Sequence, residues 1–122
     1  MHTPIRNAIL GLVTGDALGV PVEFRDRKSL KESPVTGMTG YGTYNQPPGT
    51  WSDDSALTLC TAEALAEGFS LQRIADRFVD WLYNQEWTPH GEVFDVGITT
   101  SEAISLLKTR ETPHLAGARD EN

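Results

Sequence analysis

Three adjacent oxygen-bearing residues, Ser52, Asp53 and Asp54, stand directly before a long apolar run. A hydroxyl and two carboxylates form an all-oxygen donor set, which suits Mg²⁺, Mn²⁺ or Ca²⁺ better than zinc. A bound metal ion would also remove the repulsion between the neighbouring carboxylates, which is costly against a buried segment. The competing interpretation is a helix start, in which serine accepts backbone N–H bonds and each carboxylate complements the helix dipole by about 0.3–1 kcal/mol. The motif alone favours the helix start, whereas the flexible Pro-Pro-Gly approach and the buried helix that follows favour a metal ion.

The segments that must position this motif have helical spacing. Apolar residues that recur three and four apart predict helices over 3–19, 53–67 and 71–84, a fourth from near Asp95 or Thr99, and a short one at Thr112. Gly19 and Pro21 are expected to end the first helix, with glycine in a left-handed conformation and proline preventing continuation. Ser70 is the expected N-cap of the third. Because no strand pattern is evident, the predicted fold class is all-α.

Several features of these segments carry further expectations. Asp16 falls on the apolar side of the first helix, so it should be partly buried and hydrogen-bonded, as structural support for the loop that carries Glu23. Glycines 11, 15 and 19 leave one helix face without side chains, where close packing is expected. The second helix is apolar on nearly every side, which predicts a central, buried element. Residues 25–51 are expected to form a long excursion rich in charge and turn residues, of the kind that is usually functional or disordered.

Composition limits the classes of partner and compartment. A chain of 122 residues suits one domain, and its net charge of −7 disfavours nucleic acid or an anionic membrane as a partner. No segment is expected to reach the length of a membrane span. The single cysteine, Cys60, lies within the apolar run and cannot form an internal disulfide. A reducing, cytoplasmic location is therefore predicted.

Three ordered blocks of sequence then resemble one family. The blocks GLVTGDALGVPVEF, GTWSDDSALTL and FDVGITTSEAI are similar to those of the ADP-ribosylglycohydrolases, which include the dinitrogenase-reductase-activating glycohydrolases. The resemblance covers nearly the whole chain. It implies an all-α ADP-ribosylglycohydrolase-like fold, truncated after about four to five helices, with residues 1–122 as the N-terminal portion of a single domain. Family members continue into a Gly-Asn-Gly segment and a D-x-D-[ST] motif, which are absent from these residues.

The resemblance also implies a set of site residues. Ser52, Asp53 and Asp54 match the first group of ligands for two Mg²⁺ or Mn²⁺ ions. Glu23 matches an acidic residue beside the metal centre and the scissile bond, and is the expected catalytic residue. Asp95 and Gly97 match the block that lines the ribose side of the cleft and are the expected substrate-binding residues.

The implied function is metal-dependent hydrolysis of the bond between ADP-ribose and a protein side chain, most often arginine. The expected partners are an ADP-ribosylated protein or ADP-ribose itself. With only part of the metal ligands, the 122 residues are expected to be inactive, or active only when a complementary chain supplies the remainder. The exposed apolar surface of the second helix is expected to associate with another copy or with the C-terminal portion. Two alternatives are a non-catalytic module that binds ADP-ribose or a nucleotide, and a purely structural helical domain.

Overall fold

A computed structural model of the chain describes residues 3–109 and 112–117. Its regular structure is helical, with five α-helices and three 3₁₀ turns within those residues, and no strand among them beyond an isolated bridge between Tyr41 and Gln46. The chain divides into two compact units, residues 1–55 and 56–122. The all-α prediction is confirmed.

The first unit opens with α1, Thr3–Gly19, which runs directly into the 3₁₀ turn η1, Val20–Val22. The predicted stop at Gly19 was wrong in its mechanism, because Gly19 has right-handed helical angles of φ −78° and ψ −35°. Pro21 tolerates the tighter turn, where its missing N–H costs nothing. Within residues of this unit, nothing lies within 4 Å of a Cβ built at Gly11, Gly15 or Gly19, so the expected close packing on that glycine face is not found there.

The continuous helical segment Thr3–Val22 also corrects the expectation about membrane spans. By length and composition, it is the one segment of the described chain that could cross a membrane. The sequence analysis predicted the bounds of α1 but not the 3₁₀ turn Val20–Val22 that extends the helical segment. Buried core helices and signal sequences meet the same criterion, and Asp16 places a hydrogen-bonded carboxylate in the middle of the segment. Length and apolar composition therefore do not assign α1 to a membrane.

The excursion after α1 contains more structure than the sequence suggested. Helix α2, Arg27–Glu32, begins because the carboxylate of Asp26 accepts the backbone N–H of Ser29 at 2.9 Å. A second 3₁₀ turn, η2, covers Gly42–Tyr44 and packs against η1. Gly42 is required there, since its φ is +56° and a Cβ would lie 2.0 Å from the carbonyl oxygen of Pro21.

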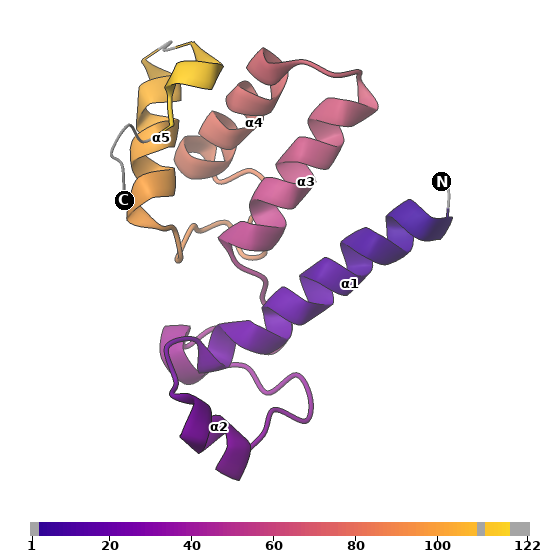
Figure 1. Ribbon diagram of the computed structural model, residues 1–122, viewed down its shortest axis with the longest axis vertical. Coiled ribbons are helices and arrows are strands. Elements are labelled where there is room, and N and C mark those ends of the chain that lie inside the picture. Colours follow the sequence, from indigo (N-terminus) through magenta and orange to yellow (C-terminus); the bar gives the residue numbers. More distant parts are fainter. Residues whose placement is uncertain (1–2, 110–111, 118–122) are drawn as a thin grey trace. The chain divides into compact units, whose positions relative to one another are not determined.

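The later helices agree closely with the sequence prediction. Helix α3 covers Asp53–Ala66, α4 covers Leu71–Asn84, α5 covers Ile98–Lys108, and the 3₁₀ turn η3 covers Pro113–Leu115. Ser70 caps α4 by accepting the N–H of Arg73 at 3.2 Å, as predicted. Figure 1 shows α4 beside α5, and these two helices share the most extensive contact between elements.

The core of the second unit is a cluster of Ala56, Cys60, Trp81 and Ile104. It draws one face of α3 together with α4 and α5. The expectation that α3 is buried on all sides was wrong, because its buried hydrophobic residues repeat every fourth position as Ala56, Cys60 and Ala64, while Leu65 is 47% exposed. A single helical stripe is enough to contact two neighbouring helices. The predicted association through its open apolar side stays a prediction.

Candidate functional site

The carboxylate of Asp16, in α1, accepts four hydrogen bonds from the residues at the start of α3. The backbone N–H of Ser52 donates to Oδ2 at 2.9 Å and its hydroxyl donates to Oδ1 at 2.6 Å. The N–H of Ser55 donates to Oδ2 at 3.2 Å, and the Ser55 hydroxyl donates to the same oxygen. All three residues belong to the first unit.

This arrangement makes Asp16 the cap of a helix that is 36 residues away in sequence. The first four N–H groups of an α-helix have no partner within it, and a carboxylate placed there also complements the helix dipole. Ser52 and Ser55 are buried, with 8% and 0% exposure, so their N–H groups would be costly to leave unbonded. Asp16 is half-buried and bonded, as the sequence predicted. Its recorded contacts support the Ser52–Ser55 turn, whereas the sequence analysis had assigned that support to the Glu23 loop.

The two neighbouring aspartates lie on the outer side of the same turn. Asp54 is exposed and Asp53 is half-buried. One oxygen of Asp53 accepts the N–H of Asp54 at 3.1 Å. Burial of these charges therefore does not argue for a metal ion, because the buried polar groups of the turn are the serines and not the aspartates. What remains in favour of a metal is the donor chemistry.

That chemistry fits a hard divalent ion as a partial ligand set. The hydroxyl of Ser52 donates a hydrogen bond to Asp16, so the lone pairs of the Ser52 oxygen are available to a cation. The carboxylates of Asp53 and Asp54 follow it directly in the first turn of α3. Among residues 3–109 and 112–117, no group of three His, Cys, Asp or Glu side chains gathers closely enough to hold a metal ion. These residues could contribute to a metal centre and would need further ligands.

Glu23 lies in the same unit, directly after η1, with extended angles of φ −54° and ψ 143°. Its side chain is half-buried. The hydroxyl of Thr43, in η2, donates to the carbonyl oxygen of Glu23 at 2.8 Å. Because η2 also packs closely against Pro21 at Gly42, the same turn fixes the backbone at Pro21 and at Glu23. Sequence reasoning missed Gly42 and Thr43 as positioning residues, although the closely spaced glycines of GMTGYGTYN already indicated tight turns in this segment.

Asp95 and Gly97 belong to the second unit. Asp95 is half-buried, in the segment that leads to α5, and Gly97 is the exposed N-cap of that helix, with φ −64° and ψ 147°. A Cβ at Gly97 would meet only the hydroxyl of Thr100, at 3.7 Å. The position therefore does not require glycine for its backbone angles. The role of these two residues in binding substrate stays a prediction.

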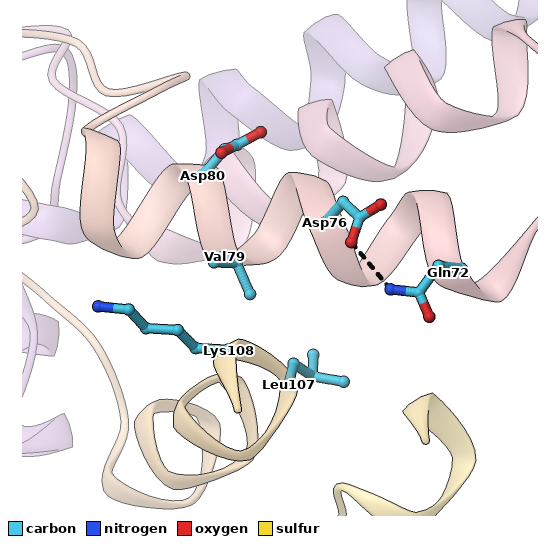
Figure 2. A pocket seen from close by; sticks show the side chains of 6 residues that line it. All are labelled: Gln72, Asp76, Val79, Asp80, Leu107 and Lys108. Carbon is cyan, nitrogen blue, oxygen red and sulfur yellow. Dashed lines mark hydrogen bonds between the residues drawn. The ribbon is translucent and has the colours of Figure 1, made fainter. Parts of the chain in front are cut away.

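The second unit also has an open hollow between α4 and α5, with a volume of about 470 Å³ (Figure 2). Its acidic side chains already have partners, since Asp76 accepts from Gln72 at 2.9 Å and Asp80 accepts from Asn84 at 2.9 Å. Lys108, which extends along the wall in Figure 2, places its ammonium 3.6 Å from the ring centre of Tyr83. None of the residues predicted from sequence lines this hollow.

The one cysteine has no chemical role in this geometry. Cys60 is fully buried in the core and donates weakly from Sγ to the carbonyl of Arg77 at 3.5 Å. Burial raises the pKa of its thiol from the usual 9.0 to about 12, and the nearby Glu63 carboxylate adds to the effect. A thiol so protonated is inert as a nucleophile.

Comparison with known proteins agrees with the resemblance found in the sequence. Residues 2–122 match the family described as ADP-ribosylglycohydrolase. An ADP-ribosylarginine hydrolase, Tri1, from Serratia proteamaculans is 35% identical over 101 residues, which are 81% of this chain and 27% of that protein. The ADP-ribosyl-[dinitrogen reductase] glycohydrolase of Rhodospirillum rubrum is 34% identical over 108 residues, 85% of this chain and 34% of that protein.

The chain thus spans about a third or less of the length of these relatives. Within that length, the match runs through both units, from α1 to the last described turn. The chain belongs to the ADP-ribosylglycohydrolase family.

Proposed function

We propose that this chain supplies the first part of a metal-dependent hydrolase that releases ADP-ribose from arginine side chains. The observation that carries the proposal is the set of hydrogen bonds from Ser52 and Ser55 to the carboxylate of Asp16. These bonds fix the first turn of α3, where Asp53 is half-buried and Asp54 is exposed. The name of the Serratia relative, an ADP-ribosylarginine hydrolase, favours arginine as the linkage.

In this proposal, Ser52, Asp53 and Asp54 hold part of a centre for Mg²⁺ or Mn²⁺. Such ions, when bound, fix ribose hydroxyls and make a nearby water more acidic. The other ligands would come from outside these residues, because the described chain offers no complete set. Asp16 does not need to touch the ion: by bonding to Ser52 and Ser55 it fixes the orientation of the turn.

The remaining residues act on the sugar and on water. Glu23, whose backbone is held by Thr43, orients the attacking water and accepts its proton. Asp95 and Gly97 line the ribose side. The bond between the ribose C1″ carbon and the arginine nitrogen breaks, hydroxide from water adds to C1″, and a proton passes to the leaving nitrogen. Surrounding carboxylates stabilise the positive charge that develops on the sugar ring.

The test compares the intact gene product with the 122-residue chain, each incubated with ADP-ribosylated arginine and Mg²⁺. We expect the intact protein to release ADP-ribose and the shorter chain to release none, because its ligand set is incomplete. Chelation should abolish the release. Activity that survives chelation, or turnover by the 122 residues alone, would contradict the proposal. Asp26→Asn in the intact protein, which alters only the N-cap of α2, controls for loss of an acidic residue outside the proposed site, and this variant should remain active.

A further inference from the structure

Phe24, the residue directly after Glu23, combines high exposure with a strained backbone. Its side chain is 84% exposed, and its φ is +64°. A left-handed conformation costs roughly 1–2 kcal/mol for a residue with a Cβ, and glycine or asparagine would adopt it more easily. An exposed ring contributes little to a hydrophobic core. Folding of this unit therefore gives no reason for an aromatic residue at this position, and strain of this kind concentrates at functional sites.

The backbone on both sides of Phe24 is nevertheless fixed. Thr43 Oγ1 binds the carbonyl of Glu23 at 2.8 Å, and the N–H of Arg25 binds the carbonyl of Val22 at 3.1 Å. The ring of Phe24 lies 6.5 Å from that of Tyr44, with the two planes inclined by 58°. This is the tilted geometry of a favourable aromatic pair. The ring is thus presented to solvent from a rigid support, next in sequence to the carboxylate of Glu23.

No cation of the described chain covers this ring. The cation–π contact among those residues is Lys108 over Tyr83, in the other unit. The neighbouring guanidinium of Arg25 donates to the hydroxyl of Ser29 at 3.2 Å, toward α2. Within the described residues, the face of the Phe24 ring is therefore open to solvent.

We propose that Phe24, supported by Tyr44, is a binding site for the guanidinium group of the ADP-ribosylated arginine. The proposal rests on the proposed function and adds the group that recognises the leaving side of the bond. A guanidinium is planar and weakly hydrated, so it stacks on an aromatic face while its N–H groups bind a carboxylate. A serine-linked ADP-ribose carries no cation and gains nothing from the ring.

The kinetic test uses Phe24→Leu in the intact gene product, which keeps an apolar side chain but removes the aromatic face. For ADP-ribosylated arginine, we expect KM to rise about 2- to 5-fold, as loss of a cation–π contact at an exposed ring implies, with kcat little changed. Hydrolysis or binding of serine-linked ADP-ribose should not change, and Phe24→Trp should restore the arginine substrate. Equal loss for both linkages, or no change for either, would overturn the proposal. Weaker binding of free ADP-ribose to Phe24→Leu would assign the ring to adenine and overturn it as well.

A binding test separates this proposal from the proposed function. The 122-residue chain is titrated with argininamide and with citrullinamide, while amide NMR shifts are followed. Citrullinamide is the control because its side chain has a similar shape but carries no charge. We expect argininamide alone to shift Phe24 and Tyr44, and Phe24→Leu to remove those shifts. If these shifts appear but the intact protein shows no hydrolysis, only the proposed function fails. If hydrolysis is present but both amides shift these residues equally, or neither does, the guanidinium site fails.

Discussion

Replacement of Asp16 by asparagine tests how strongly α1 holds the start of α3. Oδ2 of Asp16 accepts three of the four hydrogen bonds from Ser52 and Ser55. An amide oxygen in that place keeps all three, but as neutral bonds. Bonds to a charged group contribute about 1.5–3 kcal/mol and neutral ones about 0.5–1.5, so each retained bond loses about 1 kcal/mol. Because Asp16 is only half-buried, solvent screening reduces this loss of hydrogen-bond energy, and we expect the turn to lose about 2 kcal/mol of stability in total.

The assay is hydrogen exchange of the Ser52 and Ser55 amides, read by NMR, because it reports local opening of the turn. A loss of about 2 kcal/mol corresponds to exchange about 30-fold faster. Asp26→Asn is the matched control: it weakens the cap of α2, which rests on one bond to Ser29, and should leave both reporter amides unchanged. If Asp16→Asn exchanges at the rate of the unaltered chain, the hydrogen bonds seen here do not hold the turn.

Three further predictions concern the turn, the loop and the core. We expect Mg²⁺ to raise the Tm of the intact gene product in thermal melts, and we expect Asp53→Asn or Asp54→Asn to abolish that rise. If the two aspartates only cap α3, each variant should instead change stability by no more than about 1 kcal/mol and leave the response to Mg²⁺ unchanged. Gly42→Ala should destabilise the first unit by about 2–3 kcal/mol in urea unfolding, since the new Cβ meets a backbone carbonyl 2.0 Å away at φ +56°, whereas Gly37→Ala has open space and should change little. The pKa of the Cys60 thiol is higher in the folded chain than in the unfolded chain, so its contribution to stability is complete below pH 9.0 and falls as the pH rises toward about 12. Alkylation of Cys60 at pH 8 should occur only after denaturant is added. Labelling of the native chain would contradict the burial of the thiol.

Sequence patterns predicted the later helices because their signals are local. The N-cap at Ser70 depends on a single residue, and the structure confirms it. Apolar spacing then located α3, α4 and α5 within a few residues. Where the sequence failed, the deciding contact was distant: Gly19 stays helical because Pro21 continues into a 3₁₀ turn that packs against η2.

At the candidate site too, local features were predicted from the sequence and distant contacts were not. The residue types of the Ser52–Asp54 motif were evident from sequence, but Asp16 was expected to support the Glu23 loop and not this turn, because nothing local links Asp16 to residues 36 positions away. The role of Thr43 in holding Glu23 likewise depends on a contact across 20 residues. The left-handed angle of Phe24 has no sequence signal, since phenylalanine seldom adopts it.

The central claim is that Ser52, Asp53 and Asp54 bind a divalent cation, in a turn held by Asp16. Crystals of the intact gene product grown with Mn²⁺, measured for anomalous scattering, test it most directly. We predict an anomalous peak in direct contact with the oxygens of these side chains, at about 2.0–2.2 Å, the range expected for Mg²⁺-like coordination. Ordinary solvent at those oxygens, with no anomalous signal, would contradict the claim and leave helix capping as the function of the motif.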